Sequence, residues 1–394
     1  MGLSMAERKA VTRQMASRYA KASKQQKGVM LDELCALTGW HRDYARRALR
    51  VVAARPAGRR GERPPGRRAR PPVYDEAVID DLRTLWVLMD FACGKRLVAI
   101  MGEVLEALER HGELCLAPEA KAKLLSMSAA TIDRRLAGDR QRFNIRGRSG
   151  TKPGSLLKGQ IPIRTFSDWD DTRPGFVQAD LVAHCGQSAA GDFCQTLTLT
   201  DVATGWTEPR AIKNKARIWV VQSIDDIRLG LPFGLLGIDS DNGSEFINDH
   251  LFAYCADHQI TFTRGRPYRK NDSCHVEQKN WTVVRQAVGY ARYDTDIELD
   301  ALAELYGHLR LFTNFFCPQA KLIGKTRNGA KIVRRYDKPV TPYQRVLDAG
   351  VLNKTQARQL TAYYHTLNPA QLRRDISRCQ RRLRDLNHMK TQTA

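Results

Sequence analysis

Between residues 174 and 317 the pattern of apolar residues changes from a helical repeat to short runs rich in β-branched residues. Three consecutive strand patterns occupy 176–185, 193–206 and 207–212. They are followed by a helix at 216–229, a strand at 234–241, a helix at 245–258, a strand at 260–265 and helices at 272–290 and 297–316. Three strands followed by alternating helices and strands predict an α/β domain built on a mixed five-stranded sheet.

Positive charge is concentrated at both ends of the chain. The 394 residues include 64 Lys and Arg against 42 Asp and Glu, a net charge of +22, of which 1–72 and 318–394 contribute +13 each and the middle −4. Such an excess is typical of proteins that bind nucleic acid, and a basic surface kept for solubility is the alternative. We therefore expect two basic arms that hold DNA phosphates around a slightly acidic centre.

Residues 1–52 are predicted to form a helix-turn-helix DNA-binding domain. A basic helix at 6–26 precedes two helices separated by Gly39, which is the order of a helix-turn-helix. Its inward residues would be Leu31, Leu34, Leu37, Tyr44, Leu49 and Val52, and its DNA-facing residues Arg42, Arg46, Arg47 and Arg50. An ordinary helical hairpin fits the same pattern.

A basic linker and a second helical domain are predicted next. Residues 53–73 are rich in Arg, Pro and Gly, which predicts an extended linker. The linker is either passive or lies along the DNA minor groove or phosphate backbone and binds it through Arg59, Arg60, Arg67 and Arg68. Residues 74–140 have helical spacing and end in a second helix-turn-helix-like pattern. There Ser128 is the expected N-cap, and Arg134 and Arg135 are the expected DNA contacts. Residues 141–173 are predicted to be another linker.

The C-terminal region, 318–394, is basic and is predicted to end in a helix. Its clearest pattern is a strongly basic helix at 368–386 that begins at an Asn-Pro cap. Such a helix is either a solvated surface helix or a clamp on DNA or on a partner subunit. We expect the second role, which makes 318–394 a DNA-binding or partner-binding region.

Three carboxylates stand out by their positions in the predicted α/β domain. Asp180 lies inside an apolar strand, Asp241 ends a buried strand, and Glu277 lies in a helix, with 60 and then 35 residues between them. An acid inside a strand is costly unless it is paired or binds a metal. Oxygen ligands of this kind suit two Mg²⁺ or Mn²⁺ ions that clamp the attacking and leaving oxygens of a phosphodiester.

Other polar residues lie near these acids in the sequence. Asp239 is the neighbour most worth testing with the three, whereas Asp201 and Glu245 are interpreted as a turn acid and a helix-start acid. The basic loop before the Glu277 helix, with the start of that helix, is expected to hold a DNA end through Arg266, Tyr268, Arg269, Lys270, Asn271 and Lys279. Trp281 is interpreted as a core side chain, and His275 as structural.

Four segments resemble the catalytic core of the DDE superfamily of bacterial insertion-sequence transposases, which is similar to that of retroviral integrases. They are QADLVAHCG (178–186), LTDVATGWTE (199–208), LGIDSDNGSEFIN (236–248) and RPYRKNDSCHVEQKNW (266–281). The resemblance implies an RNase H-like integrase core at 174–317 with Asp180, Asp241 and Glu277 as the catalytic, metal-binding triad. The N-terminus lacks the His-His-Cys-Cys zinc module of retroviral integrases, so DNA recognition would rest on the helix-turn-helix domains.

The resulting hypothesis is a transposase that binds terminal inverted repeats, cuts one strand and joins the free 3′-hydroxyl to target DNA. Its partners would be double-stranded transposon and target DNA and further copies of itself, as a homodimer or a higher oligomer. No apolar run long enough to span a membrane is present, so we expect a bacterial cytoplasmic protein associated with the nucleoid through DNA. Two alternatives are an RNase H-like nuclease or resolvase without strand transfer, and a DNA-binding repressor derived from a transposase.

Overall fold

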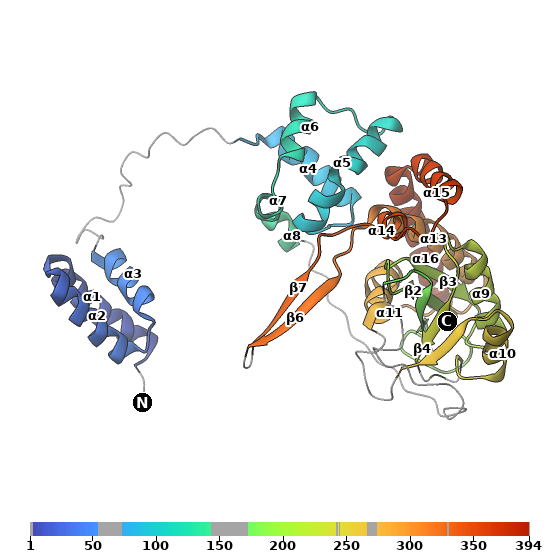
Figure 1. Cartoon of the computed structure of the whole chain (residues 1–394), viewed down its shortest axis with the longest axis horizontal. Coiled ribbons are helices and arrows are strands. Elements are labelled where there is room, and N and C mark those ends of the chain that lie inside the picture. Colours follow the sequence, from blue (N-terminus) through green and yellow to red (C-terminus); the bar gives the residue numbers. More distant parts are fainter. Residues whose placement is uncertain are drawn as a thin grey trace. The chain divides into compact units, whose positions relative to one another are not determined.

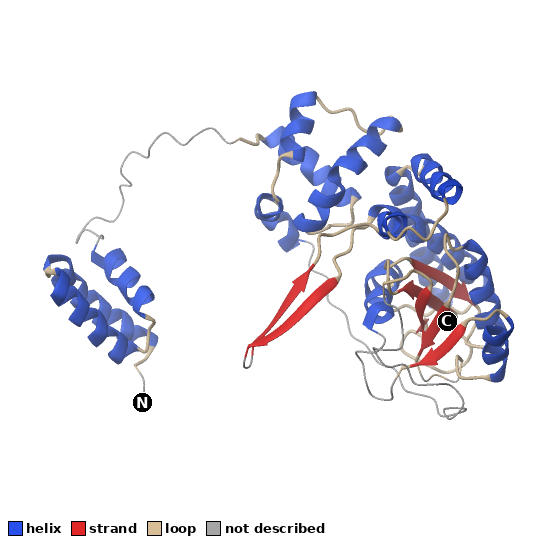
Figure 2. Cartoon of the chain, in the orientation of Figure 1, coloured by secondary structure: helices blue, strands red, loops and turns tan. Residues whose placement is uncertain are grey.

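The computed structural model describes residues 3–53, 73–142, 172–241, 243, 245–265, 274–328 and 331–393. The chain divides into two compact units, Met1–Val73 and Tyr74–Ala394. Figures 1 and 2 show the helices and strands of each unit.

The described residues of the first unit form the helices α1 (Met5–Lys21), α2 (Lys24–Thr38) and α3 (Arg42–Ala53). The predicted helix at 6–26 is shorter than expected because Ser23 caps α2 through a capping box with Gln26. Gly39 ends α2 with a positive φ of 68°, as a glycine after a helix commonly does.

The core of the first unit confirms part of the predicted apolar face. Leu31, Leu34 and Leu49 are buried, whereas Leu37 and Tyr44 are 55% and 54% exposed. The expectation for Leu37 and Tyr44 was wrong because the buried stripe runs through neighbouring positions, Thr38 on α2 and Ala45 on α3.

The second unit begins with five helices: α4 (Glu76–Leu88), α5 (Gly94–Arg110), α6 (Pro118–Leu125), α7 (Ala129–Arg135) and α8 (Ala137–Arg142). Ser128 is the N-cap of α7, as predicted, since its hydroxyl accepts a hydrogen bond from the backbone N–H of Thr131 at 3.2 Å. Leu82, Trp86, Leu97 and Leu105 are buried between these helices and form part of a larger hydrophobic core.

A mixed five-stranded sheet follows, which confirms the predicted architecture. Its strands are β1 (Phe176–Ala183), β2 (Gln195–Asp201), β3 (Thr207–Ile212), β4 (Gly237–Ser240) and β5 (Thr261–Arg264), in the order β3-β2-β1-β4-β5. The β1–β2 and β2–β3 pairs are antiparallel, and β1–β4 and β4–β5 are parallel. This order places β1 at the centre of the sheet, with β4 beside it.

The two faces of the sheet carry different side chains. Because side chains alternate along a strand, Val177 and Ala179 of β1 point to one face, where they share a hydrophobic cluster with α9 (Arg217–Gly230) and α10 (Asp249–Asp257). Gln178 and Asp180 point to the opposite face, which α11 (Cys274–Lys279) and α13 (Asp296–Phe316) cover. Figure 1 shows α9 and α10 on one side of the sheet and α11 on the other.

The C-terminal region contains more structure than its sequence predicts. A second, two-stranded sheet pairs β6 (Leu322–Asn328) with β7 (Lys331–Tyr336). The helices α14 (Pro342–Asp348), α15 (Lys354–Thr366) and α16 (Pro369–Thr393) follow. Only α16 corresponds to a predicted element, and it extends beyond the expected end at residue 386.

One hydrophobic core connects the start and the end of the second unit. Trp86 of α4, Leu105 of α5, Phe316 of α13 and Ile376 of α16 belong to the same buried cluster. The segments 74–140 and 318–394, which we predicted as separate parts, therefore pack into one unit with the α/β domain. None of the described helices combines the length and apolar character that crossing a bilayer requires.

Candidate active site

Asp180 lies on β1 with its carboxylate turned toward the helix that carries Glu277. The side-chain amide of Asn280 donates a hydrogen bond to its Oδ2 at 2.6 Å, and the backbone N–H of Leu181 donates to Oδ1 at 2.8 Å. Across the antiparallel ladder, Asp180 faces Thr198 of β2. The central strand thus holds a half-buried acid at a fixed orientation.

The pKa of Asp180 is raised to about 7, first by burial and then by the negative charge of Asp241. Glu277 and Glu245 raise the pKa further, while the hydrogen bond from Leu181 lowers it. Charges act at this strength only over short distances. The structure therefore brings the three predicted acids into one electrostatic neighbourhood and adds Glu245 to it.

Asp241 follows β4 directly, at the carboxyl end of that strand. Its Oδ1 accepts a hydrogen bond from the backbone N–H of Gly243 at 2.9 Å. Burial raises its pKa, the Gly243 hydrogen bond lowers it, and the charge of Glu245 raises it. A Cβ at position 243 would lie 2.6 Å from Cδ of Glu245 and 2.9 Å from Oδ1 of Asp241, so a larger residue there would displace the ends of these two side chains.

Glu245 is not the helix-start acid that its sequence position predicted. The helix α10 begins at Asp249, because Asn248 is its N-cap and accepts a hydrogen bond from the backbone N–H of Leu251 at 3.0 Å. Glu245 therefore lies in the turn between Asp241 and the helix, where its charge acts on Asp180 and Asp241. In the sequence, Asn248 is the one residue that indicates a helix start at Asp249 rather than at Glu245.

The helix that carries Glu277 is fixed at its start by a side chain from β1. Oε1 of Gln178 accepts hydrogen bonds from the backbone N–H groups of His275 at 3.0 Å and Val276 at 3.2 Å. After α11 the helix widens into a π-helical turn, η1 (Asn280–Arg285), and ends as α12 (Gln286–Val288). Such turns are frequent at functional sites. The Glu277 side chain is exposed, so it is accessible from solvent.

The donor atoms around Asp180 suit a hard divalent cation. Carboxylate oxygens are the ligands that Mg²⁺ and Mn²⁺ prefer. Two polar atoms beside Asp180, Thr198 Oγ1 and Asn280 Oδ1, are buried and have no hydrogen-bond partner among the described residues. Buried polar atoms normally bind a protein group or an ordered water. These residues therefore fit a site that holds a hydrated cation.

A second group of possible metal ligands in the same unit lies closer together than Asp180, Asp241 and Glu277 do. Among the described residues, Glu304 and His308 of α13 and Cys379 of α16 bring ligand atoms within 4.8 Å of one another. Glu304 of that cluster is already paired with Arg378 at 3.1 Å and Arg382 at 2.9 Å, which gives it a structural role. The triad acids are near neighbours but are not gathered to that distance.

Two neighbouring acids have structural roles. Asp239 is 1% exposed and accepts a hydrogen bond from Thr263 at 2.8 Å. Asp201 accepts hydrogen bonds from the backbone N–H groups of Gly175 at 2.8 Å and Thr204 at 2.7 Å, which matches its interpretation as a turn acid. These contacts favour Asp241 over Asp239 as the member of the site.

Lys279 and Trp281, which follow Glu277 in the chain, differ from their predictions in how far they are exposed. Lys279, predicted to contact DNA, is only 8% exposed, and burial lowers the pKa of its amine to about 7. A side chain so enclosed is poorly placed to reach a phosphate. Trp281, predicted to be in the core, is 37% exposed, because the π-helical turn buries Val283 and Val284 instead.

The other predicted DNA contacts are placed as follows. Arg47 and Arg50 of α3 and Arg134 and Arg135 of α7 are exposed. Arg42 and Arg46 of α3 pair with acids of their own unit, Asp32 and Asp43. Outside the described residues lie Arg59, Arg60, Arg67, Arg68, Arg266, Tyr268, Arg269, Lys270 and Asn271.

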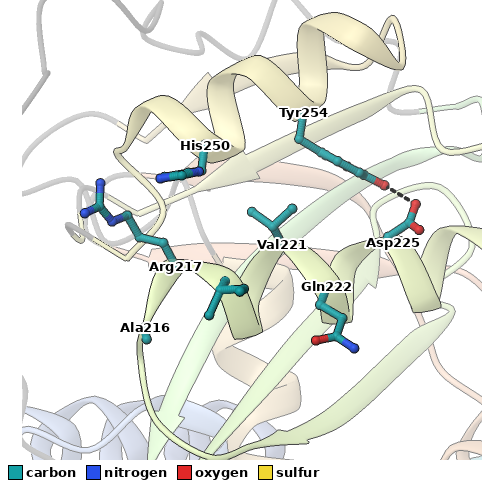
Figure 3. A pocket seen from close by; sticks show the side chains of 8 residues that line it. Ala216, Arg217, Val221, Gln222, Asp225, His250 and Tyr254 are labelled. Atoms are coloured by element: carbon teal, nitrogen blue, oxygen red, sulfur yellow. Dashed lines mark hydrogen bonds between the residues drawn. The ribbon is translucent and has the colours of Figure 1, made fainter.

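A surface groove lies on the other face of the sheet, between α9 and α10 (Figure 3). Tyr254 donates a hydrogen bond to Asp225 at 2.7 Å along its edge, and Arg217 and His250 line the opposite end. The sheet separates this groove from Asp180, so it is not part of the candidate site.

No protein-family model matches the chain. Among solved structures it is similar to the catalytic core domain of BIV integrase, with 18% sequence identity and a TM-score of 0.28. That similarity covers 45% of this chain and 95% of the integrase chain. It is also similar to the HTLV-2 integrase catalytic core domain in complex with magnesium (dimeric form), with 14% identity, 37% and 91% covered, and a TM-score of 0.29.

The uncharacterized protein y4rM of Sinorhizobium fredii (strain NBRC 101917 / NGR234) is 41% identical over 345 residues. That alignment covers 87% of this chain and 96% of the relative, so it includes most of both proteins. The chain therefore belongs to the same protein family as y4rM of Sinorhizobium fredii.

Proposed function

We propose that the protein is a DNA transposase that cuts and joins phosphodiester bonds with Asp180, Asp241 and Glu277. The observation that carries the proposal is the shared electrostatic neighbourhood of three acids from a central strand, the end of the next strand and a helix. Isolated acids do not converge on a buried strand without a cation or another charge partner. The RNase H-like order of strands expected from the sequence agrees with this arrangement.

In this proposal the three acids hold two Mg²⁺ or Mn²⁺ ions per site. The ions would lower the pKa of the attacking water or DNA 3′-hydroxyl and neutralise charge on the phosphate. Asn280 orients Asp180, and Gln178 fixes the start of the helix that presents Glu277. Trp281, exposed one turn after Glu277, is available to stack on a base of the DNA end.

DNA recognition is assigned to the exposed arginines of the helical segments. Arg47 and Arg50 of α3 and Arg134 and Arg135 of α7 are accessible to terminal inverted repeats. Because each transposon end needs its own active site, a homodimer or higher oligomer would carry out the reaction, within a bacterial cytoplasm.

The test is a strand-cleavage and strand-transfer assay with Mg²⁺ or Mn²⁺ on labelled DNA that carries the ends of the element encoding the protein. We expect Asp180→Asn, Asp241→Asn and Glu277→Gln each to reduce both products to background while DNA binding is retained. The matched control is Asp226→Asn, which changes an exposed acid of α9 on the other face of the sheet and should keep full activity.

The products separate this proposal from its alternatives. Nicks without joined products would identify a nuclease or resolvase, and DNA binding without any triad-dependent product would identify a repressor. Full activity of Glu277→Gln would refute the triad.

A further inference from the structure

The β6–β7 hairpin is a two-stranded ribbon that no other described strand joins. Its register is antiparallel, with Lys325 opposite Arg334 and Thr326 opposite Val333. An isolated two-stranded ribbon is only marginally stable in water, and both of its edges remain available for hydrogen bonds. A ribbon of this kind is expected to have a partner.

The ribbon is strongly basic, and two of its arginines are exposed and not paired with any acid in the described part of the chain. Residues 321–338 contain seven Lys or Arg and one acid. Arg334 and Arg335 are exposed and have no ion-pair partner in the described part of the chain. By contrast, the basic helix α16 uses Arg374 and Arg382 in ion pairs with Glu113 and Glu304. The hairpin is therefore the better candidate for binding a polyanion.

Cations lie on both faces of the ribbon. Arg334 and Tyr336 of β7 alternate with Val333 and Arg335, so the two pairs point to opposite faces. Arg327 of β6 is opposite Ile332, two residues before Arg334, and so shares the face of Arg334. A ribbon that lay flat on one charged surface would need cations on one face only.

Apolar side chains are exposed beside these cations. Leu322, Ile323, Val333 and Tyr336 are 50%, 56%, 46% and 53% exposed. Apolar side chains in a DNA groove can contact thymine methyl groups and base edges. Their exposure would be unfavourable if the ribbon only touched phosphates from outside.

We infer that the β6–β7 ribbon enters a groove of double-stranded DNA. The major groove, about 12 Å wide, admits a two-stranded ribbon, and phosphates on both of its walls match the cations on both faces. This assignment rests on the proposal that the protein acts on DNA. The β6–β7 ribbon would then bind the duplex from the same unit that carries the candidate active site.

The test compares full-length proteins for binding to a labelled 30-base-pair duplex by fluorescence anisotropy at several salt concentrations. We expect Arg334→Ala/Arg335→Ala to lower the slope of log affinity against log salt by about 0.9 for each lost phosphate contact, which is roughly an eightfold loss per contact at 0.1 M salt. Lys215→Ala/Arg217→Ala removes the same charge at the start of α9 and should leave the slope within a few tenths of the wild-type value.

Direct proximity is measured by placing a photo-crosslinking amino acid at the exposed Thr326, with Lys215 as the control position. Crosslinks from 326 to DNA support the inference. Wild-type salt dependence in the arginine variant, or crosslinks from 326 only to a second copy of the chain, would overturn it while the proposed function stands. Failure of the wild-type protein to bind any duplex, including its own element's ends, would instead overturn the proposed function and the inference together.

Discussion

His184 is a buried residue whose pKa is changed by its surroundings. It is fully buried, with Nε2 2.7 Å from the Thr196 hydroxyl, which in turn lies 2.6 Å from the Tyr306 hydroxyl. Burial, and then the positive charge of Arg285, lowers the pKa of His184 to about 3. The imidazole is therefore neutral in the folded protein near neutral pH.

This residue makes the stability of the second unit sensitive to acid. Below the unfolded pKa of 6.5 the unfolded chain takes up a proton that the folded chain does not, so stability falls as pH falls, by about 1.4 kcal/mol per pH unit. Urea unfolding of the wild-type protein between pH 6.5 and 5 should show about 1.6 kcal/mol more loss than His184→Gln, because the unfolded histidine is already half protonated at pH 6.5. Equal losses in the two proteins would show that His184 is protonated in the folded state.

At the level of single residues, the sequence predicted the acids but not the side chains that position them. Asp180, Asp241 and Glu277 were recognisable because an acid in an apolar strand and the spacing of a known superfamily coincide. Gln178 and Asn280 are ordinary amides whose partners are about 100 residues away in the chain. Such partners become visible only when the strand and the helix are placed side by side.

At the level of elements, α16 changes from an expected surface or DNA-binding helix to a helix bound to its own unit. Leu372, Ile376 and Leu383 are buried, and the amine of Lys390 donates hydrogen bonds to Asp294 and Glu298, both at 2.8 Å. Because the sequence does not show where the acids of other helices lie, a basic helix that binds intramolecular acids cannot be distinguished from one that binds DNA.

The ion pair of Lys390 gives a measurable difference between these two roles. Glu298 is only 2% exposed, so Lys390→Met leaves a buried carboxylate without its cation and should cost about 1–3 kcal/mol of unfolding free energy. Lys354→Met, at an exposed position of α15, should cost less than about 0.5 kcal/mol. Adding Glu298→Gln to Lys390→Met should recover part of the loss. Unchanged stability with weakened DNA binding would instead favour the clamp role.

The hairpin was missed although its sequence carries a signal for it. Asn328 and Gly329 form the dipeptide that most favours a tight turn, and strand-like residues lie on both sides of it. The seven basic residues of 321–338 hid this pattern. In the five-stranded sheet, β3 has the bounds that the sequence predicts, Thr207–Ile212.

At the level of the whole molecule, the buried side chains form separate hydrophobic cores in the two units. Among the described residues, the buried hydrophobic cluster of the first unit consists of Ala16, Tyr19, Leu31, Leu34, Ala45 and Leu49. The two larger clusters contain residues from position 78 onward only. Apolar periodicity predicted helices in both units, but it could not show that 74–140 shares a core with α13 and α16, because packing between distant helices leaves no local pattern.

This division predicts the effect of removing residues 1–73. Since the buried clusters of the second unit, as far as its residues are described, consist of that unit's own side chains, the shortened protein should unfold within a few degrees of the corresponding transition of the full chain by calorimetry. Its DNA affinity should fall by a factor on the order of 10²–10⁴, because residues 1–72 carry a net charge of +13 and two linked binding parts bind more tightly than one. A large drop in the unfolding temperature would show that the first unit stabilises the second, and unchanged affinity would show that the first unit does not bind DNA.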